Sequence, residues 1–204
     1  MKNIITIQHT QAVHHNNGMV GSWTDWELTD TGKEHAENIG IKLSRELKNR
    51  EWKIYSSDLI RAKQTAEPLA RHIGIAIEYR KNLREFNLGE AVGKTKQWAK
   101  ENANKEYSRQ AFDIPEFTGA ETWREFWKRV LLVCDDIASD SADNIVIVSH
   151  GFTLCVLHQI WLNPDIAESN YSGIPGGVSF LEINDNGERI IKRLYDASYM
   201  VKLE

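Results

Sequence analysis

The stretch "IITIQHTQAVHH" (residues 4–15) begins as an apolar, largely β-branched run and presents a histidine, His9, where that run stops. A short, continuously apolar run of this kind is typical of a strand buried on both faces of a largely parallel sheet. The segment "NIVIVS" (residues 144–149) has the same character and is followed directly by His150. We therefore predict two central strands that each end at a histidine.

Helical patterns follow the predicted strands, which is the rhythm of an α/β protein. Apolar residues recur at helical spacing after Thr31, after the weaker third strand "KIYSS" (53–57), over 121–138 and over 151–161. For the first helix we predict a capping box between Thr31 and Glu34.

The end of the chain predicts an antiparallel hairpin, because "VSFLEI" (178–183) and "RIIKRLY" (189–195) flank "NDNGE". Its Asn186-Gly187 pair suits a type I′ turn. Residues 86–120 are polar and irregular, which indicates an excursion over the top of the domain. The sequence thus predicts one domain over residues 1–204, a three-layer α/β/α sandwich with a mostly parallel central sheet and one antiparallel edge hairpin.

Composition limits the classes of partner. Hydrophobic residues make up 41% of the 204 residues and charged residues 26%, the balance of a soluble globular protein. A net charge of −4 gives no reason to expect nucleic acid. The sequence has no apolar run of signal-peptide or membrane-spanning character, so we expect no membrane association and a cytoplasmic location. Cys134 and Cys155 lie among apolar residues and are expected to be reduced core thiols.

Three reactive groups fall at the carboxyl ends of the predicted strands, where open α/β sheets bind ligands. His9 ends the first strand, Arg61 lies in the first turn of the helix after 53–57, and His150 precedes the last buried helix. The helix N-terminus at Gly151 offers backbone N–H groups and a positive dipole end to an anion.

Six segments that include these residues occur in a fixed order along the chain: "QHT" (8–10), "LTDTG" (28–32), "YSSDLIRAKQTAE" (55–67), "LREFNLGEAVG" (83–93), "TGAETWREFWKRV" (118–130) and "VIVSHG" (146–151). Together they resemble the motifs of the histidine phosphatase superfamily, the phosphoglycerate mutase-like proteins. The resemblance spans nearly the whole chain.

The resemblance implies a phosphatase that works through a phosphohistidine. His9 attacks the phosphoryl group, Arg61 and His150 hold its oxygens, and Glu85 is the proton donor. Neither a metal nor another cofactor is implied. The nearby Glu90 is the competing candidate for the acid.

Substrate contacts are expected from Gln8, Gly151 and the loop that contains Asn16, Gly21 and Trp23. For Trp23, packing against the neighbouring helix is an equal alternative. We expect His14 and His15 to be solvent-exposed loop residues, because adjacent histidines rarely converge on one metal ion and no carboxylate spacing supports a zinc site.

Gln8 departs from the family pattern, which has arginine before the first histidine. An amide lacks the charge and the forked geometry of a guanidinium. A charge-assisted hydrogen bond contributes roughly 1.5 to 3 kcal/mol, so the loss lowers turnover by one to two orders of magnitude.

The leading hypothesis is therefore a phosphatase of small phosphorylated metabolites, active as a monomer or homodimer and weakened by Gln8. The alternatives are a catalytically impaired member that binds a phosphorylated ligand or a protein partner and, less favoured, a phosphoglycerate mutase.

Overall fold

The computed structural model describes residues 1–204 except 49, 109, 168–171 and 203–204. Its strands are β1 (Lys2–Gln8), β2 (Lys53–Ser57), β3 (Ile77–Arg80), β4 (Asn144–Ser149), β5 (Val178–Ile183) and β6 (Arg189–Asp196). They form one sheet in the order β3-β2-β4-β1-β5-β6. The pairs β1/β4, β2/β4 and β2/β3 are parallel, whereas β5 pairs antiparallel with both β1 and β6. The mostly parallel sheet and its antiparallel edge hairpin are confirmed.

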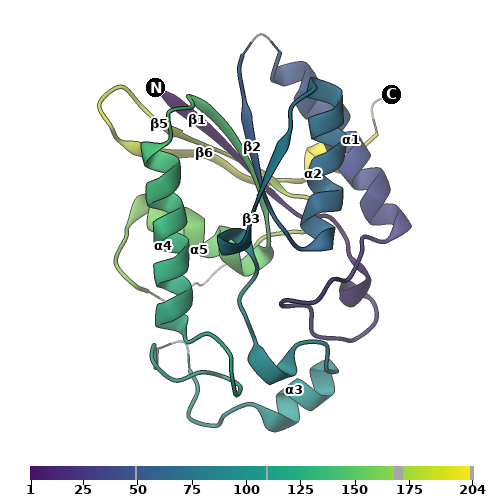
Figure 1. Ribbon diagram of the computed structural model, residues 1–204, viewed down its shortest axis with the longest axis vertical. Helices are drawn as coiled ribbons and strands as arrows, with labels where there is room; N and C mark the ends of the chain where they lie inside the picture. The colour runs from purple at the N-terminus through teal and green to yellow at the C-terminus, as the bar shows by residue number, and fades with distance from the viewer. Residues whose placement is uncertain (49, 109, 168–171, 203–204) are drawn as a thin grey trace.

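Two pairs of helices cover the two faces of the sheet (Figure 1). The helices are α1 (Asp30–Glu46), α2 (Ile60–Ile73), α3 (Lys96–Asn102), α4 (Trp123–Ser139) and α5 (Gly151–Leu162). Helices α1 and α2 pack on the face formed by Ile7, Val146 and Val148, and α4 and α5 pack on the opposite face. The predicted three-layer sandwich is therefore confirmed.

The buried strands explain this arrangement, because β4 is buried at every position and β1 over its last five residues. Strand β3 carries no comparable apolar run, since Glu78 and Tyr79 are exposed, and it was not predicted. Both cysteines are buried and are not joined in a disulfide, as expected. Within the described residues, no helix is long and apolar enough to cross a membrane.

The predicted capping box of the first helix is wrong. Helix α1 begins at Asp30, and its N-cap is Thr29, whose side chain accepts a hydrogen bond from the backbone N–H of Gly32 at 3.0 Å. Thr29 has an extended backbone (φ −70°, ψ 168°), whereas Thr31 already lies inside the helix. Threonine is a good N-cap at either position, so residue type alone did not select between them.

The hairpin is present, but its predicted type I′ turn is wrong. Such a turn needs positive φ at both central residues, and among the non-glycine residues described only Ser22 and Tyr195 have positive φ. The carbonyl of Asn184 instead accepts the N–H of Gly187, which has φ +81°, and the N–H of Asn184 donates to Glu188. This is a longer loop in which Gly187 alone takes the left-handed conformation.

The excursion after residue 86 lies beyond the carboxyl ends of the parallel strands, as Figure 1 shows for α3. It is less irregular than predicted, because Thr95 caps α3 by accepting the N–H of Trp98. Backbone bridges join Met19 to Thr95 and Leu88 to Ala120. The excursion is thereby tied to the loop after β1, and both segments border the site described next.

Candidate active site

A pocket of about 470 Å³ opens at the carboxyl ends of β1 and β4. Parallel pairing aligns Gln8 with Ser149, so the residues that follow, His9 and His150, lie side by side with ring centroids 5.1 Å apart. The residues around the pocket come from β1, the loop after it, α2, the excursion and α5: Gln8, His9, His14, His15, Met19, Val20, Gly21, Ser22, Arg61, Glu85, Phe86, Leu88, Lys96, Tyr107, Glu116, Gly151 and Phe152.

His9 is held as a neutral imidazole whose lone pair lies on Nε2, where it accepts a hydrogen bond from Nε of Arg61. Its Nδ1 donates to the backbone carbonyl of Thr10 at 2.8 Å, which leaves the lone pair on Nε2. Burial, and next the Arg61 guanidinium, hold the pKa of His9 well below its usual range. A neutral imidazole with an unprotonated ring nitrogen is the form required of a nucleophile.

Arg61 is the buried cation of the pocket and is 1% exposed. Its Nε lies 3.2 Å from Nε2 of His9, and its terminal nitrogens donate to the carbonyls of Ser22 and Thr24, each at 2.7 Å. Ser22 holds a left-handed backbone conformation, with φ 43°. Burial lowers the pKa of Arg61 to about 10, so the guanidinium stays charged at neutral pH.

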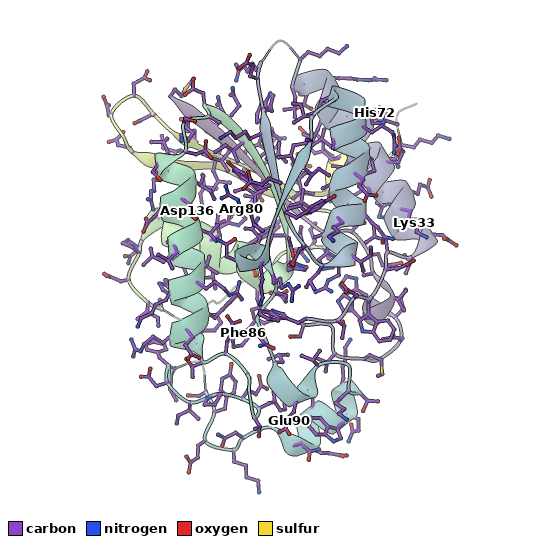
Figure 2. All side chains as sticks on the ribbon, in the orientation of Figure 1. Lys33, His72, Arg80, Phe86, Glu90 and Asp136 are labelled. Carbon is purple, nitrogen blue, oxygen red and sulfur yellow. The ribbon has the colours of Figure 1, made fainter. Side chains whose placement is uncertain are left out.

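Glu85 lies against the N-terminus of α5. Its Oε1 accepts the N–H groups of Phe86 and Thr153, at 2.9 and 3.2 Å, and its Oε2 accepts the N–H of Phe152 at 3.3 Å. Burial raises the pKa of this carboxyl, and these hydrogen bonds and Arg61 oppose the rise. The competing candidate Glu90 is exposed and lies beside α3, farther from the sheet than Phe86 (Figure 2).

His150 is fully buried at the N-cap of α5. Its Nε2 lies 2.7 Å from the hydroxyl of Ser57, which also accepts the N–H of Leu59. In the tautomer in which the Ser57 hydroxyl donates to Nε2, the ring proton lies on Nδ1, which has no hydrogen-bond partner within the described chain. Burial, followed by Arg61, lowers the pKa of His150 well below its usual value.

Gln8 lies at the base of the pocket and is 6% exposed. A Cβ atom at Gly151 would be 3.4 Å from its Nε2, and one at Gly173 would be 2.3 Å from its Oε1. The two glycines therefore enclose the amide. Its Oε1 is buried and has no hydrogen-bond partner among the residues described.

The three predicted contacts from the loop after β1 lie in different surroundings. Gly21 lines the pocket, whereas Asn16 is exposed just beyond a 3₁₀ turn, Val13–His15. Trp23 does not line the pocket, and its Nε1 donates to the backbone carbonyl of Glu85 at 2.6 Å. Trp23 thus supports the backbone of the predicted acid. Substrate contact by these residues remains a prediction.

The expectation that His14 and His15 are solvent-exposed is wrong. Both are half-buried and line the pocket, with their ring centroids 4.2 Å apart. The His15 ring is stacked on the His9 ring, with the ring centroids 5.4 Å apart and an interplanar angle of 12°. Burial lowers the pKa of His14 to about 3 and that of His15 to about 4. The error arises from the 3₁₀ turn, which the sequence did not indicate. The turn directs both rings toward the pocket.

Nitrogen atoms of His9, His14 and His15 lie within 4.8 Å of one another, a spacing that a metal ion could use. Two of the three lone pairs are engaged, however. Nε2 of His9 accepts from Arg61, and Nδ1 of His15 accepts the N–H of Ala12 at 3.1 Å. A cation there would also face the Arg61 charge. The cluster as arranged is a hydrogen-bonding group, and the absence of a metal requirement stays a prediction.

The fold, with a neutral histidine, a buried arginine and a carboxyl group at one sheet edge, defines a phosphoryl-transfer class of α/β protein. The chain belongs to the histidine phosphatase superfamily (branch 1), whose family model matches residues 4–196. It is a phosphatase of that type, as the relatives support.

Two relatives are named for different activities. "Putative phosphoserine phosphatase 2" of Hydrogenobacter thermophilus is 32% identical over 169 residues, which cover 79% of this chain and 81% of the relative. "Phosphoglycerate mutase-like protein 4" of Arabidopsis thaliana is 28% identical and matches 76% of this chain and 69% of its own length. The α-ribazole phosphatase of Shigella flexneri has a similar fold, with a TM-score of 0.84 at 19% identity and 99% coverage of both chains.

The buried imidazoles predict that acid destabilises the fold. The folded-state pKa values of His9, His150 and His158 lie below the ordinary value, so the unfolded chain binds more protons at acidic pH. The free energy of unfolding should fall by about 1.4 kcal/mol per pH unit below about pH 6.5 for each such histidine. Urea unfolding at a series of pH values measures this slope.

Glu85 acts in the opposite direction, because its folded pKa is raised and its contribution is present at low pH and lost as pH rises through that pKa. The buried histidines outnumber it, so the net slope keeps the histidine sign. A His158→Gln variant, which changes a residue outside the pocket, should show a shallower slope than wild type. An identical slope in the two proteins would mean that His158 is already protonated when folded.

Proposed function

We propose that the protein is a phosphomonoesterase that hydrolyses small phosphorylated metabolites through a phosphohistidine formed on His9. The observation that carries the proposal is the contact between Nε2 of His9 and Nε of Arg61 at 3.2 Å, with the carboxyl of Glu85 in the same pocket. A nucleophile, a permanent cation and a titratable acid are the groups that phosphoryl transfer without a metal requires.

In the first step, the lone pair on Nε2 of His9 forms a bond to phosphorus while the bond from phosphorus to the leaving oxygen breaks. Glu85 in its protonated form gives its proton to that oxygen, and the alcohol leaves. In the second step, water attacks the phosphohistidine and gives a proton to the Glu85 carboxylate. The N–P bond breaks, inorganic phosphate leaves, and Nε2 recovers its lone pair.

The other groups stabilise charge on the phosphoryl oxygens. The Arg61 guanidinium is held by the Ser22 and Thr24 carbonyls, so it needs little reorganisation when charge builds up. Nδ1 of His150 has no described partner and is suited to donate to an equatorial oxygen. The backbone at Gly151 begins α5 and adds the positive end of the helix dipole.

Two observations bear on the substrate. The pocket volume of about 470 Å³ suits a small ester, and a relative named for phosphoserine supports a phosphorylated metabolite. The competing functions are a binding protein weakened by Gln8 and a phosphoglycerate mutase. A mutase would need a bisphosphate primer, whereas a phosphatase would not.

The proposal is tested by trapping labelled phosphate on the protein. Wild type mixed with a ³²P-labelled ester and quenched in alkali should carry acid-labile label, and His9→Ala should carry none and lose activity. His35→Ala, which changes a histidine of α1 outside the pocket, is the control and should label like wild type. Undiminished turnover by folded His9→Ala would remove His9 as the nucleophile.

Glu85→Gln should slow esters with poor leaving groups most. An alkoxide needs a proton in order to leave, whereas p-nitrophenolate leaves largely unaided. We expect kcat on an alkyl phosphate to fall by about 10² or more and kcat on p-nitrophenyl phosphate to change far less. Glu90→Gln, at the competing carboxylate, should leave both rates unchanged. Equal slowing of the two esters by Glu85→Gln would assign the acid role to another group.

Gln8→Arg should raise kcat/KM on simple phosphate esters, because a second guanidinium would place charge and a forked donor at the base of the pocket. We expect a gain of roughly tenfold, which corresponds to about 1.4 kcal/mol of transition-state stabilisation. Gln8→Lys is the matched variant, with charge but no fork, and should gain less. An unchanged or lower kcat/KM in folded Gln8→Arg would show that the site is built around the amide.

A further inference from the structure

The phosphoryl site contains too little fixed positive charge for the ligand proposed above. A phosphate ester brings close to two negative charges at neutral pH, and Arg61 is the only fully buried cation among the described lining residues. Gln8 is neutral, and Lys96 lies at an exposed position. An uncompensated charge in a partly closed pocket is costly, and nearby titratable groups respond by changing their protonation.

His15 is fixed as a neutral donor. Because its Nδ1 accepts the N–H of Ala12 at 3.1 Å, the ring proton of the neutral side chain is on Nε2. Protonation of Nδ1 would set two N–H groups against each other. Its ring stacks on His9 and lines the pocket, so the Nε2–H of His15 stands beside the nucleophile.

The protonation state of His14 is not fixed by a hydrogen bond to Nδ1. Its Nδ1 is buried and lacks a hydrogen-bond partner in the described part of the chain, which is an unfavourable state unless a ligand or a proton changes it. The ring is seated directly on Gly21, where an added Cβ would lie 2.6 Å from Cδ2 and 2.7 Å from Nε2 of the imidazole. The glycine therefore makes room for the ring at the pocket wall.

The other titratable groups around the pocket are less suited to accept a proton. Nε2 of His9 must stay unprotonated to attack phosphorus and already accepts the N–H of Arg61, and Nε2 of His150 is hydrogen-bonded to Ser57. Glu85 is the remaining competitor, because burial already favours its protonated form. Tyr107 and Glu116 also line the pocket. Burial, followed by His15, Arg61 and Lys96, disfavours a charge on His14 without a bound anion, and burial, Arg61 and Lys96 do the same for His15.

We propose that His14 and His15 form a second oxyanion-binding element: Nε2–H of His15 donates to a phosphoryl oxygen, and His14 takes up a proton from solvent as the dianion enters. The protonated His14 supplies the positive charge that Gln8 does not. This inference rests on the proposed function for the identity of the ligand, but it concerns binding and can be tested without turnover.

The test uses tungstate, a dianion that resembles phosphate and forms no phosphohistidine. Calorimetric titration at about pH 7.5, in buffers of different ionisation enthalpy, gives both the affinity and the number of protons taken up. We expect wild type to take up close to one proton per tungstate. His14→Gln should take up none and bind about tenfold more weakly. His15→Phe keeps the stacked ring and should lose about tenfold in affinity while proton uptake persists.

Two further variants separate the alternatives. If Glu85→Gln abolishes proton uptake and His14→Gln retains it, the carboxyl takes the proton and the inference is overturned. His35→Gln, in α1 outside the pocket, should match wild type in both quantities. Gly21→Ala moves the His14 ring without removing it and should reduce both affinity and uptake.

Histidine ¹⁵N spectra of wild type with and without tungstate provide a readout that needs no variant. Protonation shifts both ring nitrogens of His14, whereas those of His15 should keep the neutral pattern. An unchanged His14 signal in the bound protein would overturn the inference. If tungstate binds as expected but no phosphohistidine can be trapped, the proposed function fails and the anion element stands.

Discussion

The hydrogen bond from Nδ1 of His9 to the carbonyl of Thr10 is the constraint on which the site depends, because it fixes the side of the ring that carries the lone pair. Because Nδ1 carries the ring proton, Nε2 carries the lone pair and accepts a hydrogen bond from Nε of Arg61. The arginine is in turn fixed by two backbone carbonyls rather than by a carboxylate. Its charge therefore remains available to an incoming anion, since no carboxylate among the residues that the structure describes forms an ion pair with it.

Parallel strand pairing brings these groups together. The register that sets Gln8 beside Ser149 makes the ends of β1 and β4 coincide, and α2 begins three residues after β2 ends. His9, Arg61 and His150 thus come from three separate segments that a parallel sheet aligns at one edge. Glu85 comes from a fourth segment, directly before the excursion, and its carboxylate accepts backbone N–H groups of α5.

Most of this arrangement could be predicted from the sequence, because β1 and β4 are unbroken apolar runs and each histidine directly follows one. What could not be predicted depends on local backbone conformation. Thr29 and Thr31 are chemically equivalent caps, and only the extended backbone of Thr29 distinguishes them. Likewise, the adjacent pair His14 and His15 gives no periodic signal, and a three-residue 3₁₀ turn decides that both rings face the pocket.

Gln8 and the His14–His15 pair are best understood together. A guanidinium at position 8 would have been a second permanent cation in contact distance of the same anion, and its field would have opposed any further positive charge nearby. A neutral amide removes that repulsion. A titratable imidazole in the same pocket can then carry charge only while an anion is bound. A second permanent guanidinium would repel Arg61 whether or not an anion is bound, whereas an imidazole that is protonated only with the anion avoids this repulsion in the free protein.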